Sequence, residues 1–210
     1  MNLARFPVAR RVALGALLVA LGACSPGGRA ADRAADRAAD QAPADAALSQ
    51  GSLFELAFPL IDGEGRTRHM TDLGGAPFVA SMIYTSCSSV CPRIIADLQA
   101  LEKALPDRER ARTRFVLLSL DPERDTPEAL RRFAADHVLD STRWTLLTAG
   151  ADDMRTLAAV FGVRVRPDEG GEIAHSAVIA VVDSGGVVRH RQIGLQSDMA
   201  PLVMAVRAAR

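Results

Sequence analysis

The chain has 210 residues, of which 49% are hydrophobic, and its 25 basic residues balance its 25 acidic ones. This length is enough for one globular domain with a substantial core. The charge pattern excludes a typical nucleic-acid-binding protein, because no basic stripe with interleaved aromatic residues is present.

The first 23 residues have the pattern of a signal peptide. Three arginines precede the apolar run 12–21, which is too short to span a bilayer. The run ends in Leu21-Gly22-Ala23-Cys24, which resembles the lipobox of bacterial lipoproteins, where cleavage precedes a cysteine that becomes lipidated. We therefore expect a lipid on Cys24 that anchors the protein in the bacterial cell envelope, facing the periplasm or the exterior. The alternative is an ordinary signal peptide cut nearby, with Cys24 incidental.

Residues 24–50 have the composition of a tether. They consist mainly of Ala, Asp, Arg, Gly and Pro and contain a near-repeat of Ala-Ala-Asp-Arg. Such a segment buries too little apolar surface to order itself, although its alanines would also suit a charged helical spacer. Without residues 1–23 the chain has 22 basic and 25 acidic residues, a net charge of −3. We expect residues 51–210 to form the folded domain.

Strand and helix signals alternate along the folded domain. The segment 53–61 alternates in polarity and ends in Asp62-Gly63, which indicates a hairpin. Continuous apolar strands between helices predict an α/β fold whose mixed central sheet has helices on both faces. The order of elements is similar to a thioredoxin-like fold with an N-terminal β-hairpin. The expected elements are strands at 77–84, 114–121 and 144–147, helices at 92–105, 126–137, 152–161 and 197–208, and a hairpin of strands 177–182 and 187–193.

Cys87 and Cys91, with three residues between them, lie between the first buried strand and the first helix. The N–H groups at a helix N-terminus favour the thiolate form of cysteine. If Cys24 carries a lipid, these two are the remaining cysteines, and in an oxidising compartment such a pair is a structural bridge or a working dithiol. A bridge closing so short a loop would restrain the unfolded chain little. The sequence therefore predicts a redox-active dithiol that exchanges disulfides or holds a soft metal.

Three segments together resemble the Sco/SenC family, the copper-binding assembly factors of cytochrome oxidase. They are Tyr84-Thr85-Ser86-Cys87-Ser88-Ser89-Val90-Cys91-Pro92, then Ser119-Leu120-Asp121-Pro122-Glu123-Arg124-Asp125-Thr126-Pro127-Glu128, and Ala174-His175-Ser176. The resemblance implies one copper ion per chain, bound by Cys87, Cys91 and His175. Two thiolates select Cu(I), and an added imidazole makes the set tolerable for Cu(II). The alternative for His175 is a histidine at the end of a mobile loop, 166–174, with no ligand role.

Two acidic residues follow the second buried strand. Asp121 is either an acidic group near the copper or a partner contact, or else it caps the backbone of the loop that it begins. Asp125 fits the entry of the next helix, where a carboxylate suits the helix dipole. His69, His137 and His190 show no ligand pattern.

Three functions follow from these residues. The first is a copper carrier that delivers the ion to the copper-bearing subunit of cytochrome c oxidase or to another cuproenzyme. The second is a thiol–disulfide oxidoreductase that reduces the target's cysteines, and the third is a redox or copper sensor without turnover. The expected partners also include another copper chaperone, a thioredoxin-like reductant and, through the lipid, a membrane.

Overall fold

The structure, a computed structural model, describes residues 51–167, 173–195 and 198–209. The predicted signal peptide, the tether and Cys24 lie outside the described residues. None of the helices in the described ranges has the length and apolar character needed to cross a membrane. The strands are β1 (Leu60–Asp62), β2 (Thr67–Arg68), β3 (Phe78–Ile83), β4 (Arg114–Ser119), β5 (Trp144–Thr148), β6 (Val165–Pro167), β7 (Ile173–His175), β8 (Val178–Val182) and β9 (Val188–Ile193).

The helices begin and end at recognisable signals. In α4, the Thr126 side chain accepts a hydrogen bond from the Ala129 N–H (3.3 Å) and a proline follows, as expected of an N-cap. The chain leaves α5 through Gly162, whose φ of 70° is readily available to glycine. The helices are α2 (Cys91–Ala104), α3 (Asp107–Arg112), α4 (Pro127–Asp136), α5 (Ala151–Phe161) and α6 (Ala200–Ala208), with 3-10 helices at Leu53–Glu55 and Met70–Leu73.

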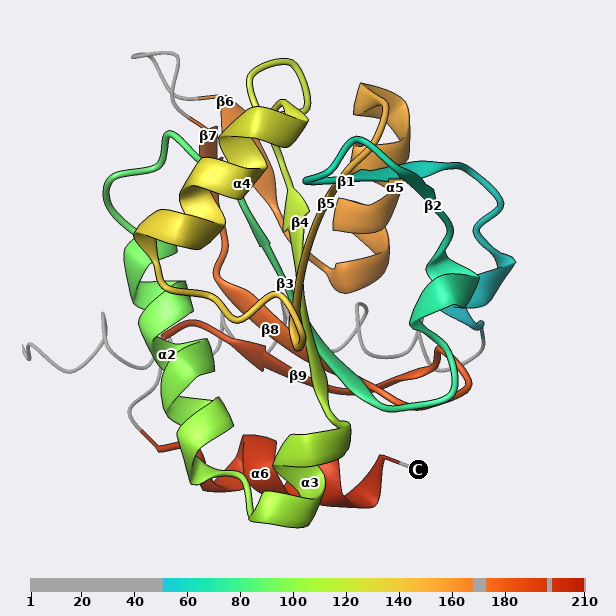
Figure 1. Cartoon of the computed structure of the whole chain (residues 1–210), viewed down its shortest axis with the longest axis vertical. Coiled ribbons are helices and arrows are strands. Elements are labelled where there is room, and N and C mark those ends of the chain that lie inside the picture. The colour runs from blue at the N-terminus through green and yellow to red at the C-terminus, as the bar shows by residue number, and fades with distance from the viewer. Residues whose placement is uncertain (1–50, 168–172, 196–197, 210) are drawn as a thin grey trace, which may run out of the picture. The chain divides into compact units, whose positions relative to one another are not determined.

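Seven strands form one mixed sheet in the order β2-β1-β5-β4-β3-β8-β9. The central strands β3, β4 and β5 run parallel, and the strands outside them pair antiparallel. Because parallel neighbours need crossover connections, helices come between them in the chain and lie on the faces of the sheet (Figure 1).

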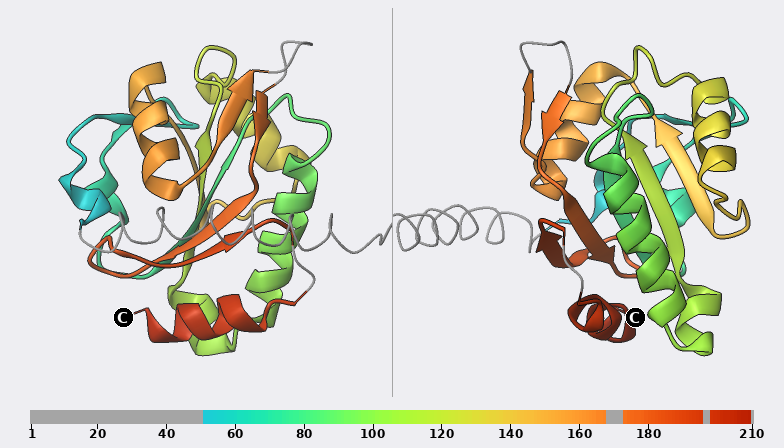
Figure 2. Two further views of the ribbon diagram at one scale, coloured as in Figure 1. Left: turned by 180° about the vertical axis from the view of Figure 1, so that it is seen from behind. Right: turned by 90° about the vertical axis from the view of Figure 1, so that its left-hand side faces the viewer.

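Alternate residues of the central strands pack into two separate cores. On β3, Val79 and Ile83 face the core formed with α2, α4 and α6, whereas Ala80 and Met82 face the core formed with α5 and the 3-10 helices. Figure 2 shows α4 and α5 on opposite sides of the sheet. This arrangement confirms the predicted thioredoxin-like α/β fold with helices on both faces.

Four local predictions differ from the structure. The alternating segment 53–61 begins as a 3-10 helix, because Ser52 and Glu55 form a capping box that competes with a strand. The short helix α3 is built of charged residues with none buried, so it lacks apolar periodicity. The segment expected as a loop, 166–174, includes most of β6 and β7, which pair as a separate two-stranded sheet. The last helix begins at Ala200 rather than at 197.

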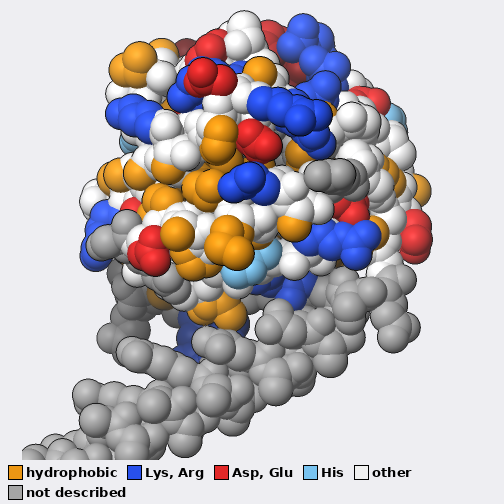
Figure 3. Space-filling model, turned by 90° about the horizontal axis from the view of Figure 1, so that it is seen from below, with side chains coloured by type: hydrophobic (Ala, Val, Ile, Leu, Met, Phe, Trp, Pro, Cys, Tyr) orange, Lys and Arg blue, Asp and Glu red, His pale blue; other side chains and the backbone are white. Residues whose placement is uncertain are grey.

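One end of the domain carries α3 and α6. Viewed from that end, hydrophobic side chains gather near the centre of the face and charged side chains border them (Figure 3). Met204 of α6 is 69% exposed. The cysteine pair lies elsewhere, where β3 leads into α2.

Candidate metal and thiol centre

The two cysteines occupy the turn that connects β3 with α2. The Cys87 N–H donates to the Tyr84 carbonyl (3.2 Å), which folds the chain back directly after the strand. Cys91 is the first residue of α2, and its N–H donates to the Cys87 sulfur (3.4 Å). Pro92 follows in the first turn of the helix, where its missing N–H costs nothing. The turn therefore directs a helix N–H group at the Cys87 sulfur.

Cys87 is the more acidic of the two free thiols. Burial raises its pKa, but hydrogen bonds outweigh burial, first the one from the Cys91 N–H and then those from the Cys91 side chain and Ser89. The result is a pKa of about 7, below the usual range for a thiol. Because its pKa is lowered, Cys87 carries more thiolate at neutral pH than an ordinary cysteine and is the nucleophile of the pair.

Cys91 has the opposite character. It is fully buried, and burial is the main reason that its pKa is raised well above the usual range, with the neighbouring Cys87 and the charge of Asp125 adding to the effect. Its sulfur lies 3.5 Å from Nε2 of His175. Without a metal, the pair therefore consists of an acidic outer thiol and a protonated inner thiol.

His175 comes from the small sheet and not from a loop. It ends β7, where it pairs with Val165 of β6. Its Nδ1 lies 3.2 Å from the Ser176 carbonyl oxygen; because a carbonyl can only accept, Nδ1 carries the proton and Nε2 presents its lone pair to Cys91. Burial lowers the pKa of His175, which keeps the ring neutral and able to bind a metal.

Tyr84 packs beside His175. It is buried, and its ring meets the imidazole edge-on with the centroids 5.8 Å apart. As expected for an aromatic residue at the end of a buried strand, it packs in the core, and it also restricts the orientation of the imidazole.

The two acidic residues after β4 lie in different surroundings. The carboxylate of Asp121 forms an ion pair with Arg124, whose side chain is 56% exposed. Asp125 is fully buried, and its carboxylate accepts hydrogen bonds from the Thr85 N–H (3.1 Å), the Thr85 hydroxyl and the Ser119 hydroxyl (2.6 Å). Asp125 thus holds the turn ahead of Cys87, whereas the sequence had suggested only a role at the entry of α4. The role of Asp121 near a metal stays a prediction.

The three predicted ligands meet at one point. The sulfurs of Cys87 and Cys91 and a ring nitrogen of His175 all lie within 4.8 Å of one another. Two sulfurs bound at about 2.3 Å to one d¹⁰ ion such as Zn²⁺ would stand roughly 4 Å apart, so small side-chain rotations suffice to close the set on an ion. Among the described residues, this is the one group of three or more Cys, His, Asp or Glu side chains with such geometry.

Known proteins share this architecture. Residues 46–208 match the family described as SCO1/SenC. The crystal structure of a SCO1/SenC family lipoprotein from Bacillus anthracis str. Ames superimposes with a TM-score of 0.65 at 26% identity, covering 72% of this chain and 92% of that one.

Two further structures belong to named Sco proteins. BsSco, described as a member of the Sco family of cytochrome c oxidase assembly proteins with a disulfide switch, gives a TM-score of 0.63 at 27% identity over 72% of this chain and 90% of its own. Arabidopsis thaliana ScoI with copper bound gives 0.62 at 21% identity over 72% and 96%; this last likeness shows the fold alone. The family match covers most of the chain and includes both cysteines and the histidine, so this chain belongs to the SCO1/SenC family.

Proposed function

We propose that the domain binds one copper ion through Cys87, Cys91 and His175 and delivers it to a cuproenzyme. The proposed target is cytochrome c oxidase, which would receive the ion at its dinuclear copper site. The observation that carries the proposal is the convergence of two sulfurs and one imidazole nitrogen within 4.8 Å. Thiolates select Cu(I) and imidazole suits Cu(II), and copper-bound ScoI and the oxidase-assembly protein BsSco share the fold.

The two thiols make different contributions to binding. Cys87 would bind first, because its lowered pKa favours the thiolate and it is also slightly more accessible than Cys91. Cys91 must lose its proton when it binds, because a metal ion deprotonates a coordinating thiol. His175 is neutral and needs no proton loss. Binding therefore releases about one proton at pH 8, most of it from Cys91.

Three ligands leave room for a fourth. A ligand of the target protein can attack the copper before any of the three leaves, so the ion need never be free. Reprotonation of Cys91, whose raised pKa favours the thiol, then opposes return of the ion. The buried inner thiol thus supplies a driving force for release.

Copper competition tests this proposal. Reduced protein is titrated with Cu(I) in the presence of a Cu(I) chelator, for the wild type, His175→Ala and the control His69→Ala, which replaces an exposed histidine outside the site. We expect one copper per chain, held much less tightly by His175→Ala alone. Equal affinity in all three proteins would refute the ligand set.

A second candidate, a thiol–disulfide reductase, is favoured by the unequal pKa values of Cys87 and Cys91. The Cys87 thiolate would attack a target disulfide and release one target thiolate. Cys91 would then give up its proton and attack the Cys87 sulfur, which releases the second target thiolate and leaves Cys87 and Cys91 bridged. Two electrons pass to the target, and a thioredoxin-like dithiol must restore them.

This reaction does not need His175 as a ligand. If His175→Ala retains disulfide exchange and the wild type retains no copper, the reductase is the better description. If the wild type binds copper tightly and neither cysteine exchanges with a disulfide substrate, the copper carrier is the better description. The two activities are compatible in one domain, and the two assays measure them separately.

For localisation, we propose that Cys24 carries a lipid and that residues 24–50 tether the domain to a membrane of the cell envelope. Support comes from the lipobox-like sequence ahead of Cys24 and from the lipoprotein of the same family in Bacillus anthracis.

A further inference from the structure

An apolar cleft of about 240 Å³ opens beside Gly51, the first residue that the structure describes. Its walls are aliphatic and consist of Leu53, Leu56, Val160 and Val188. The last three of these are half-buried and pack against the edge of the core that holds α5. Ser52 and Glu55 also line the cleft, but they already bond to each other in the capping box. The cleft therefore exposes aliphatic surface to water, which is unfavourable.

The chain enters the domain at the rim of this cleft in a fixed position. The Leu53 N–H donates to the Gly186 carbonyl (2.8 Å), and the Ser52 hydroxyl donates to the Gly185 carbonyl (2.6 Å). At Gly186 φ is 82°, and a Cβ there would lie 2.5 Å from the Ser52 Oγ, so this close approach requires glycine. The residues that precede Gly51 in the chain therefore start from a point that is held beside the cleft.

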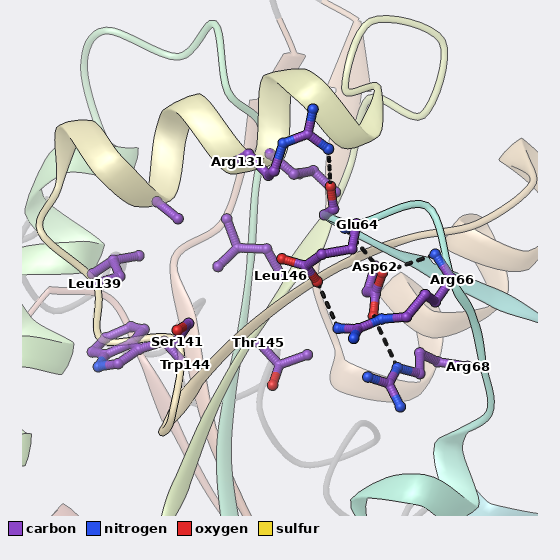
Figure 4. A pocket seen from close by; sticks show the side chains of 13 residues that line it. Asp62, Glu64, Arg66, Arg68, Arg131, Leu139, Ser141, Trp144, Thr145 and Leu146 are labelled. Atoms are coloured by element: carbon purple, nitrogen blue, oxygen red, sulfur yellow. Dashed lines mark hydrogen bonds and ion pairs between the residues drawn. The ribbon is translucent and has the colours of Figure 1, made fainter.

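The larger cleft between α4 and the β1–β2 hairpin, of about 370 Å³, is less suited to an apolar segment. Its charged groups bond to one another, because the Asp62 carboxylate pairs with Arg66 and Arg68. Arg131 reaches from α4 to the Gly63 carbonyl (Figure 4). An apolar side chain that entered there would remove these polar groups from water without bonding to them, which costs free energy.

The segment before Gly51 contains one residue that suits the apolar cleft. Between residues 25 and 50, Leu48 is the single Leu, Ile, Val, Met or aromatic residue. It precedes Gly51 by three residues, which span at most about 10 Å, so it stays near the cleft. An apolar cavity of about 150 Å³ can hold benzene, and a cleft of about 240 Å³ thus has room for a leucine side chain. The SCO1/SenC family match begins at residue 46 and includes this segment.

From these observations we infer that the side chain of Leu48 docks in the cleft beside Gly51 and fixes the last residues of the tether to the folded domain. The gain in free energy grows with the apolar surface that leaves water. Because the link between Leu48 and the cleft is short, docking is intramolecular and occurs at a high effective concentration. Within residues 25–50, the Ala, Asp, Arg, Gly and Pro residues that precede Leu48 offer no comparable side chain.

Docking of Leu48 determines where the tether leaves the domain. The cleft lies near the start of β3, since Phe78 of β3 pairs with Val182 of β8, and Val182 pairs with Val188 of the cleft. The cysteine pair follows the opposite end of β3, and a strand of six residues is roughly 20 Å long. The tether thus leaves at the end of the sheet remote from the two thiols, where it does not cover them.

Methyl contacts measured by nuclear magnetic resonance test the inference directly. The sample is the whole chain in its reduced form, with labelled leucine and valine methyl groups, and Leu48→Ala assigns the Leu48 signals. We expect nuclear Overhauser contacts between Leu48 and the methyl groups of Val160 and Val188. Val203 of α6 packs against the other core and should show no contact with Leu48.

A double-mutant cycle provides a second measurement. Leu48→Ala should lower the Tm of the whole chain by about 2–4 °C, the shift expected when a domain of this size loses part of one aliphatic contact. The same substitution should cost clearly less in the Val160→Ala background, because the cleft is already wider there. It should cost the full amount in the Val203→Ala background. Ala39→Ser, nine residues before Leu48 in the tether, should leave the Tm unchanged.

Three results would overturn the inference. They are the absence of contacts between Leu48 and both cleft valines, an unchanged Tm in Leu48→Ala, and equal losses of Tm in the Val160→Ala and Val203→Ala backgrounds. Neither copper binding nor disulfide exchange enters these measurements. Failure of this inference is therefore distinguishable from failure of the proposed carrier function.

Discussion

The buried carboxylate of Asp125 offers the sharpest test of how the cysteine turn is held. In Asp125→Ala, three donors lose their acceptor: the Thr85 N–H, the Thr85 hydroxyl and the Ser119 hydroxyl. A buried donor left without a partner costs about 1–3 kcal/mol, the smaller value applying to hydroxyls, which can rotate. The three unpaired donors together cost about 4 kcal/mol of folding stability. Because the variant no longer buries a charged carboxylate, the expected net loss falls to about 3 kcal/mol.

Urea unfolding of the reduced protein measures this free energy. The comparison variant is Asp121→Ala, four residues earlier, whose carboxylate is also largely buried but is held by an ion pair with the half-exposed Arg124; because Arg124 can turn to solvent when it loses this acceptor, we expect a smaller loss of about 1 kcal/mol there. Asp125→Asn should fall between the two, because its amide oxygen can still accept from Thr85 while its NH₂ group opposes a hydroxyl donor.

A small effect of Asp125→Ala on stability would show that this carboxylate does not hold the turn. If Asp125→Ala loses no more stability than Asp121→Ala, with the slope of the unfolding curve unchanged, the hydrogen bonds to Thr85 and Ser119 do not support the turn. A stable Asp125→Ala protein would also remove the link between β4 and the cysteine pair that these contacts provide.

Three further predictions concern the thiols, a helix cap and the anchor. Iodoacetamide should alkylate Cys87 at a rate that rises with pH about a midpoint near 7, because the thiolate is the nucleophile. Cys91 should stay unmodified because its pKa is raised, and mass spectrometry locates the label. A midpoint near 8.5 for Cys87 would contradict the lowering of its pKa by hydrogen bonds. Thr126→Ala should lower the free energy of unfolding by about 1 kcal/mol through loss of the α4 cap, and an unchanged urea midpoint would be inconsistent with it. Cys24→Ser should abolish incorporation of labelled fatty acid in cells, and acylation that persists would disprove the proposed lipid site.

Local patterns in the sequence were enough to predict most of the secondary structure. The apolar runs of β3 and β4 and the Thr126-Pro127 start of α4 act within a few residues, so they can be read from the chain alone. Segments whose local signals conflict were predicted less well. Ser52 and Glu55 favour a capping box within an alternating, strand-like pattern, and α3 has no apolar face to reveal it.

The choice between two neighbouring acids required the tertiary structure. Asp121 and Asp125 both follow β4 in a loop and both are buried, and nothing in their immediate sequence says which carboxylate meets several buried donors. Thr85 lies 40 residues from Asp125, and the parallel pairing of β3 with β4 is what brings them together. A buried carboxylate is stable only where several donors meet it, and the fold provides those donors at Asp125.

The chain alone indicates that two thiols lie at the start of a helix, but it does not reveal that their surroundings are unequal. The difference between the acidic Cys87 and the weakly acidic Cys91 arises in the folded protein, because packing in the core removes Cys91 from water and raises its pKa. Likewise the small β6–β7 sheet places His175, 84 residues away in sequence, 3.5 Å from Cys91. Local signals set the elements of this protein, whereas long-range packing sets the distances and the dielectric environment on which its chemistry depends.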